Sequence, residues 1–118
     1  GDTTVITEKF LAQEEMVSVD TAYFLSLVQG VLEDKVSLDT QLQLFLDRPL
    51  KELDLVELAI LRLGAYELSQ HPEVPYKVIL NESIELAKMF GATDSYKYIN
   101  GILHLLAKKI RVLEFKDK

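Results

Sequence analysis

Hydrophobic side chains recur every three to four positions along most of the chain, which is the spacing of one face of an α-helix. The segment from Thr21 to Lys35 has this pattern, and its expected inner residues are Phe24, Leu25, Val28, Val31 and Leu32. A second helix is expected from Ser37, a residue type that caps helix N-termini, to Leu46. Its expected inner residues are Leu38, Leu42 and Phe45. No useful stretch alternates hydrophobic and polar residues, so the pattern predicts an all-α protein.

The most hydrophobic of the predicted helices follows Asp54. Asp54 and Glu57 have the spacing of a capping box, in which each side chain accepts a hydrogen bond from the backbone N–H of the other residue. The helix LVELAILRLGAYELSQ is apolar over more than half of its circumference, which predicts a central and mostly buried position. His71 and Pro72 are expected to end it, because the residue before a proline disfavours helical dihedral angles.

Two further helices complete the pattern. Pro75 is expected to open the helix PYKVILNESIELAKMF, and Gly91 to end it. The loop GATDS then leads into a last helix, from about Ser95 to Val112, capped by Thr93 or Asp94.

The last helix has two contrasting stripes. Its expected inner residues are Ile99, Ile102, Leu103, Leu106 and Ile110. The polar stripe, interpreted as a solvated face, consists of Lys97, Asn100, His104, Lys108 and Arg111. Gly101 is unusual inside a helix, and we expect it to mark the close approach of another helix.

Composition narrows the class of protein. A length of 118 residues predicts one domain with its own core. There is no cysteine, and the two histidines do not have the spacing of metal ligands. No apolar run is long enough to span a membrane and no signal peptide opens the chain, so a soluble cytoplasmic protein without cofactor or membrane contact is expected.

Charge is distributed unevenly along the chain. Residues 1–57 contain twelve acidic and four basic residues, whereas residues 58–118 contain seven acidic and nine basic ones. The net charge of −6 argues against tight nonspecific binding of nucleic acid, which depends on phosphate neutralisation. The C-terminal half still has enough basic residues for a weakly basic face.

Candidate chemistry is sparse, and it points to binding. No phosphate-binding loop, zinc-protease motif or nucleophile elbow is present, so no catalytic residue is predicted. Tyr96 and Tyr98 flank Lys97 at a helix N-terminus, where an aromatic ring can stack on a base and a lysine can neutralise a phosphate. Spacing alone favours a tyrosine packed in the core and a solvated lysine.

Three segments in order resemble the NusB family of transcription antitermination factors. The first, AILRLGAYEL, has the family's arginine and its Tyr-Glu-Leu at Arg62, Tyr66, Glu67 and Leu68. The second, VPYKVILNE, matches at Pro75, Tyr76, Lys77, Val78, Leu80, Asn81 and Glu82. The third, GATDSYKYING, matches at Gly91, Ala92, Asp94, Ser95, Lys97, Tyr98, Ile99, Asn100 and Gly101.

The resemblance implies a NusB-like, all-helical fold of two small packed bundles and no enzymatic activity. Residues 1–118 would form one domain, with 1–19 a loosely ordered remnant, 20–46 part of the first bundle, 47–112 the second bundle and 113–118 a tail. It also implies a heterodimer with the ribosomal protein NusE, binding of boxA RNA, and a place in the RNA polymerase antitermination complex on ribosomal RNA operons.

The same match implies roles for individual residues. Asp94, Lys97 and Tyr98 would lie at the RNA, and Glu57 near the protein partner. The chain departs from the family at its start, because an Arg-rich first helix is expected there and Lys9 is the only basic residue before Asp20. The first helix would then be missing, and exposed core residues would favour a homodimer or a domain-swapped arrangement.

Two other functions stay open at this point. One is the NusB-like RNA-binding accessory domain of an RNA cytosine methyltransferase, and the other is a helical adaptor that binds only proteins. The first requires a Rossmann-type domain after this one, which the sequence through Lys118 does not contain.

Overall fold

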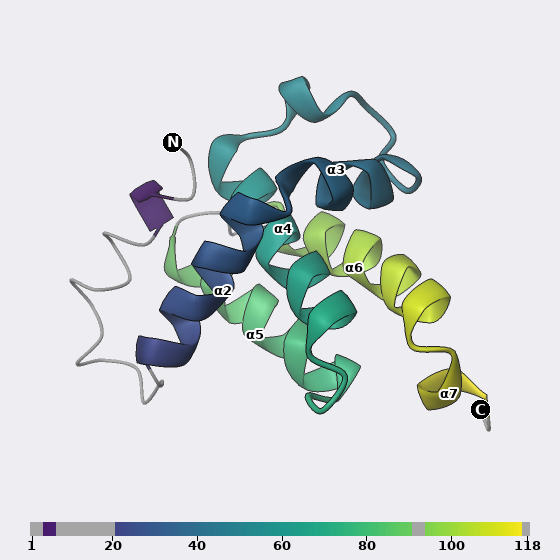
Figure 1. Ribbon diagram of the computed structural model, residues 1–118. Helices are drawn as coiled ribbons and strands as arrows, with labels where there is room; N and C mark the ends of the chain where they lie inside the picture. The colour runs from purple at the N-terminus through teal and green to yellow at the C-terminus, as the bar shows by residue number, and fades with distance from the viewer. Residues whose placement is uncertain (1–3, 7–20, 91–93, 117–118) are drawn as a thin grey trace.

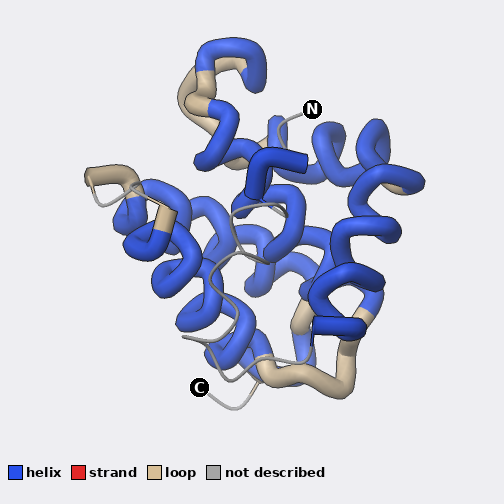
Figure 2. Tube along the Cα trace, turned by 90° about the vertical axis from the view of Figure 1, so that its left-hand side faces the viewer, coloured by secondary structure: helices blue, strands red, loops and turns tan. Residues whose placement is uncertain are grey.

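The computed structural model describes residues 4–6, 21–90 and 94–116, and Figure 1 shows how their helices are arranged. No strand occurs among these residues (Figure 2), so the predicted all-α class is confirmed. None of the helices described is both long and apolar enough to cross a membrane. The elements are α2 (Thr21–Glu33), α3 (Lys35–Gln43), the 3₁₀ helix η2 (Leu50–Glu52), α4 (Leu55–Gln70), α5 (Tyr76–Met89), α6 (Tyr96–Ile110) and α7 (Val112–Phe115).

Helix α4 is the centre of the fold, as its hydrophobic sequence predicted. It packs against α2, α3, α5 and α6, and Figure 1 shows it running through the middle of the molecule. Ten of its sixteen residues are buried. The core is therefore built around one helix that has neighbours on most of its sides.

The predicted signals at both ends of α4 are confirmed. Oδ1 of Asp54 accepts hydrogen bonds from the N–H of Val56 at 2.7 Å and of Glu57 at 3.4 Å. In return, Oε1 of Glu57 accepts one from the N–H of Asp54 at 3.1 Å, which completes the capping box. At the other end, His71 is the C-cap, and the helix stops before Pro72.

The buried polar side chains of α4 have partners on α2 and α3. Nε and a terminal nitrogen of Arg62 each donate to one carboxylate oxygen of Asp39 on α3, both at 2.8 Å. The hydroxyl of Tyr23 on α2 donates to Oε2 of Glu67 at 2.7 Å. These bonds offset the desolvation of two charged groups that are otherwise costly to bury.

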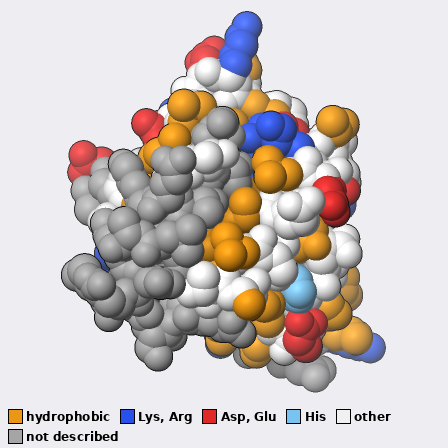
Figure 3. All heavy atoms as spheres, turned by 60° about the vertical axis from the view of Figure 1, so that its left-hand side comes forward, with side chains coloured by type: hydrophobic (Ala, Val, Ile, Leu, Met, Phe, Trp, Pro, Cys, Tyr) orange, Lys and Arg blue, Asp and Glu red, His pale blue; other side chains and the backbone are white. Residues whose placement is uncertain are grey.

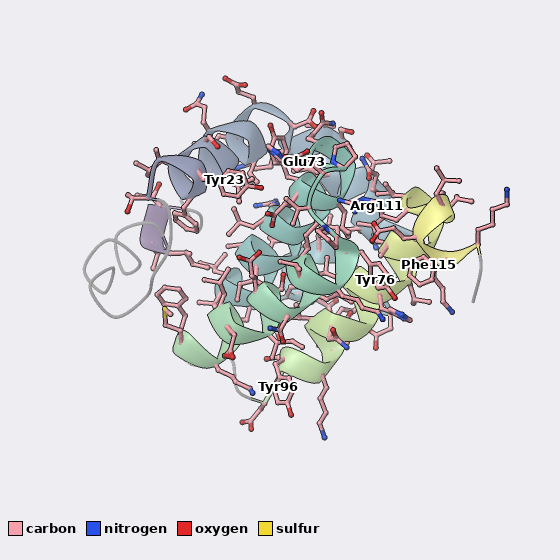
Figure 4. The ribbon with its side chains drawn as sticks, turned by 90° about the horizontal axis from the view of Figure 1, so that it is seen from below. Tyr23, Glu73, Tyr76, Tyr96, Arg111 and Phe115 are labelled. Atoms are coloured by element: carbon pink, nitrogen blue, oxygen red, sulfur yellow. The ribbon has the colours of Figure 1, made fainter. Side chains whose placement is uncertain are left out.

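Arg111 ties the C-terminal end of α4 to its neighbours. This side chain is buried and donates hydrogen bonds to the carbonyls of Leu68 at 2.9 Å, His71 at 2.9 Å and Val74 at 2.8 Å. It also pairs with Glu114, whose Oε2 accepts from the N–H of Tyr76 at 3.0 Å at the start of α5. Figure 4 shows Arg111 beside the C-terminal part of the bundle. The prediction that Arg111 belongs to a solvated stripe is therefore wrong, because the chain leaves helical geometry at this residue and the side chain turns inward.

The face of α2 turned to the core differs from the prediction. Phe24, Leu27, Val28 and Val31 are buried, while Leu25 is 41% exposed and Leu32 is 50% exposed. Leu25 and Leu32 are seven positions apart and so share one edge of the helix, which lies outside the contact with α4. Figure 3 shows that hydrophobic side chains also reach the surface on the face that comes forward when the left-hand side of Figure 1 is turned toward the viewer.

Three helix boundaries also differ from the prediction. Helix α3 begins at Lys35, so Ser37 lies within the helix. Helix α5 ends at Met89, and Phe90 is its C-cap. The N-cap of α6 is Ser95 instead of Asp94, because Asp94 and Ser95 form a turn before the helix. The other predicted caps, Gly91 and Thr93, lie outside the described residues.

Glycine has opposite surroundings at two helical positions. A Cβ atom on Gly30 would lie 2.1 Å from Cζ of Tyr66, so this glycine lets the ring of Tyr66 lie directly on α2. A Cβ atom on Gly101 would meet nothing within 4 Å. The predicted close approach of a helix at Gly101 is therefore wrong. Such an approach occurs at Gly30, and also at Gly64 on α4, where a Cβ atom would lie 2.6 Å from Cδ1 of Leu103.

The two glycines give a matched test of packing. We expect Gly30→Ala to destabilise the fold by about 1–3 kcal/mol, because the ring of Tyr66 has to move. Gly101→Ala should stabilise it by about 0.5–1 kcal/mol, since alanine loses less backbone entropy in a helix. Urea denaturation followed by circular dichroism measures both, and equal effects of the two substitutions would contradict this account.

Arg111 gives a second test. Arg111→Met should lower the free energy of unfolding by about 3 kcal/mol, because several buried carbonyls lose their donor while the apolar part of the side chain is kept. Lys108→Met on the exposed side of α6 is the control and should change stability by less than about 0.5 kcal/mol. Similar denaturation midpoints for the two variants would show that Arg111 has no such role.

Candidate functional site

The first turn of α6 meets the loop between α3 and η2. The hydroxyl of Tyr98 donates a hydrogen bond to Oδ1 of Asp47 at 2.9 Å, across 51 positions of sequence. Cζ of Arg48 lies 4.8 Å from the centre of the Tyr98 ring, and Nε of Arg48 donates to Oδ1 of Asp47 at 3.0 Å. We call Asp47, Arg48, Asp94, Lys97 and Tyr98 the Tyr98 surface.

Electrostatics link these three contacting side chains. Hydrogen bonds from Arg48 and then from Tyr98 lower the pKa of Asp47, so this carboxylate stays ionised. Burial and then the hydrogen bond to Asp47 raise the pKa of Tyr98, so its hydroxyl stays protonated. The loop thus holds a guanidinium over an aromatic ring through one shared carboxylate.

The structure places the predicted residues as follows. Asp94 and Lys97 are exposed, and Tyr98 is half-buried. Glu57 is half-buried and takes part in the capping box, and its negative charge also contributes to raising the pKa of Arg48, after the larger effects of Asp47 and Tyr98. Glu57 therefore lies at the border of the Tyr98 surface.

Sequence reasoning missed Asp47 and Arg48. Their only local signal was a short loop before Pro49, which indicates a turn and no particular chemistry. Their role depends on a contact with α6 that no spacing in the sequence reveals.

A second basic side chain lies over an aromatic ring nearby. Nζ of Lys88, near the end of α5, is 5.1 Å from the centre of the Tyr96 ring. In Figure 4, Tyr96 lies at the edge of the molecule, away from Tyr76 and Arg111. Each of the two tyrosines next to Lys97 in the sequence therefore has a basic side chain over its ring, Lys88 over Tyr96 and Arg48 over Tyr98.

This chemistry suits an anionic ligand with flat rings. Arginine and tyrosine planes stack on bases, and exposed lysines neutralise phosphates. The described residues contain no group of three or more side chains that could hold a metal ion.

Comparison with known proteins identifies the family. The family model of the NusB family matches residues 3–108. The chain belongs to the NusB family. The transcription antitermination protein NusB of Alcanivorax borkumensis is 50% identical over 113 residues, which cover 96% of this chain and 75% of the relative. The protein of the same name from Marinobacter nauticus is 49% identical, with 96% of this chain and 72% of the relative covered.

A solved structure agrees with the sequence comparison. T. maritima NusB matches with a TM-score of 0.72 at 25% identity, over 98% of this chain and 94% of that chain. The sequence and structure comparisons thus agree that the chain is a member of the NusB family, whose relatives named above are transcription antitermination proteins. The predicted resemblance and fold class are confirmed.

The hydrogen bond between Asp47 and Tyr98 can be tested by titration. We expect Asp47→Asn to lower the pKa of Tyr98 toward the usual tyrosine value, because the charged acceptor is lost. NMR of ¹³C-labelled tyrosine as a function of pH measures this. Asp94→Asn removes an exposed carboxylate from the same surface and should leave the pKa of Tyr98 unchanged. An unchanged pKa in Asp47→Asn, or an equal fall in both variants, would disprove the link.

Proposed function

We propose that this chain binds boxA-type RNA together with the ribosomal protein NusE, as a cytoplasmic component of the RNA polymerase antitermination complex on ribosomal RNA operons. The observation that carries this proposal is the stack of Arg48 on Tyr98, with exposed Lys97 beside it. Together with membership of the NusB family, this chemistry favours single-stranded RNA, whose unstacked bases are free to pack on aromatic and guanidinium planes.

The Tyr98 surface divides the binding between stacking and charge. One face of Tyr98 is covered by Arg48, so a base would extend the stack on the guanidinium or pack against the part of the ring that stays exposed. Lys97 would neutralise a phosphate, and Asp94 would position the loop at the start of α6. Because the net charge is −6, only a few local contacts would favour RNA, and a second protein would supply much of the affinity.

Glu57 supports a basic protein partner. Its Oε1 accepts the N–H of Asp54, while Oε2 has no hydrogen bond to a described residue. That oxygen is available to a lysine or arginine of NusE at the border of the Tyr98 surface. Contact with the partner there would place the two proteins on the same stretch of RNA. Self-association as a homodimer also remains part of the proposal, and light scattering over a range of concentrations would measure it.

Substitutions at the Tyr98 surface test RNA binding. We expect Lys97→Gln to weaken binding of a boxA RNA several-fold in the presence of NusE, and to reduce the salt dependence by about 0.7 in log Kd per log salt, since one phosphate contact is lost. Fluorescence anisotropy at several salt concentrations measures both. Lys109→Gln, an equal change of charge at the far end of α6, is the control and should have little effect.

Two outcomes would contradict the proposal. Equal effects of Lys97→Gln and Lys109→Gln would mean that the Tyr98 surface is not the RNA site. If NusE binds and no RNA-dependent signal appears even then, the chain is a purely protein-binding adaptor.

A further inference from the structure

The C-terminal half of α6 and the short helix α7 share an exposed surface that is distinct from the Tyr98 surface. Three of its aliphatic side chains reach solvent: Leu105 is 45% exposed, Val112 59% and Leu113 80%. Exposed lysines lie between and beside them in the sequence. We define the Leu113 surface as Leu105, Lys108, Lys109, Val112, Leu113 and Lys116, the last of which is the C-cap of α7.

Helical spacing gathers these residues on one side of each helix. The two lysines of α6 come three and four positions after Leu105, which is the spacing of one helix face. On α7 and its C-cap, the residues of the Leu113 surface lie opposite Glu114 and Phe115, which contact the start of α5. Only Arg111 separates the two helices, and they contact each other, so the two faces are neighbours.

Contacts on the inner side hold α7 in place. The ring centres of Phe115 and Tyr76 are 4.4 Å apart, and the ring of His104 meets Phe115 edge-on with centres 5.7 Å apart. Glu114 pairs with buried Arg111 and accepts a hydrogen bond from the N–H of Tyr76 at 3.0 Å. Figure 4 shows Tyr76, Arg111 and Phe115 near one another at this end of the molecule. The apolar side chains on the outer side of α7 are therefore held in a fixed direction.

The lysines of the Leu113 surface form no ion pair with a described residue. Helix α6 contains no acidic residue, and Glu114 on α7 is already paired with Arg111. Lys108 and Lys109 lie in the last turn of α6, where a positive charge also interacts favourably with the helix dipole. That effect explains two of the lysines, and it does not explain the exposed aliphatic side chains beside them.

We propose that the Leu113 surface binds an acidic amphipathic helix of a partner protein. Apolar side chains of that helix would pack on Leu105, Val112 and Leu113, and the carboxylates that flank them would pair with the lysines. The two kinds of contact alternate on the Leu113 surface as they do on an amphipathic helix, so both the charge and the apolar pattern are complementary.

The chemistry of the Leu113 surface differs from that of the Tyr98 surface. Leucine and valine have no plane on which a base can stack, and the rings at this end, those of Tyr76 and Phe115, pack on each other. The helix rise of 1.5 Å per residue places Lys108 about 16 Å along α6 from Lys97. The proposal therefore rests on other residues than RNA binding does, and the failure of either leaves the other intact.

A designed peptide tests this chemistry directly. We would label with fluorescein a helical peptide of about 15 residues that has leucines along one face and glutamates on both sides of them. One control peptide has glutamine in place of every glutamate, and another has alanine in place of every leucine. Fluorescence anisotropy should show saturable binding of the first peptide, with Kd at least about tenfold lower than for either control. Equally tight binding of either control peptide would overturn the proposal, which requires both kinds of contact.

Substitutions locate the peptide on the protein. We expect Leu113→Ser to weaken binding about tenfold, because a leucine that the peptide covers is lost, and Lys109→Gln to weaken it about threefold through one surface ion pair. Leu44→Ser and Lys35→Gln change an exposed leucine and an exposed lysine elsewhere, and each should change Kd by less than about twofold. Thermal denaturation checks that the variants fold, and Val112→Ser replaces Leu113→Ser if that variant does not. Equal effects of the variants and their controls would overturn the proposal.

Two further measurements separate a protein partner from RNA and from lipid. Oligo-uridylate should not displace the peptide, and Lys97→Gln should leave the Kd of the peptide unchanged. Vesicles of phosphatidylcholine and phosphatidylglycerol should show no binding that depends on Leu113. Displacement of the peptide by oligo-uridylate would assign the surface to RNA, and Leu113-dependent binding of vesicles would assign it to a membrane. Either result would overturn the proposal.

Discussion

The burial of α4 is the constraint on which the rest of the structure depends. A helix with neighbours on most sides cannot solvate its polar side chains, and each unpaired group would cost several kcal/mol. Arg62 therefore requires Asp39 of α3, and Glu67 requires Tyr23 of α2. The open carbonyls at the C-terminal end require Arg111. The polar groups of the central helix thus fix which elements surround it and in which orientation.

The Tyr98 surface follows from this arrangement. Asp39 holds α3 against α4, so the loop after α3 is brought over the first turn of α6. Only then do Asp47 and Arg48 reach Tyr98, and Glu57 comes close because it begins the same central helix. This surface contains residues from three separate segments, and it therefore depends on the hydrogen bonds that the polar side chains of the buried helix α4 make with its neighbours.

Features that depend on neighbouring residues could be predicted from the sequence, whereas features that depend on contacts between distant segments could not. Local signals sufficed for α4, since the capping box and the hydrophobic pattern involve neighbouring residues. Arg111 and Gly101 were misplaced because periodicity shows which residues share a face and does not show where a helix ends or what lies opposite. The motif residues Arg62, Tyr66 and Glu67, on which the resemblance to the family rested, contact residues of the neighbouring helices α2 and α3. The resemblance was therefore firmer evidence for the architecture than for the roles of Asp94, Lys97 and Tyr98.

Carboxylates in two settings give the protein two kinds of surface. Asp47 has Arg48 and Tyr98 as donors, its pKa is lowered, and its charge is already balanced when a ligand arrives. Lys97 beside it then stays available for a phosphate. Glu67 and Glu82 line an apolar cavity whose described lining residues include no basic one, and burial raises the pKa values of both. The groups around each carboxylate, and not the net charge of the chain, therefore decide whether its negative charge is balanced within the protein.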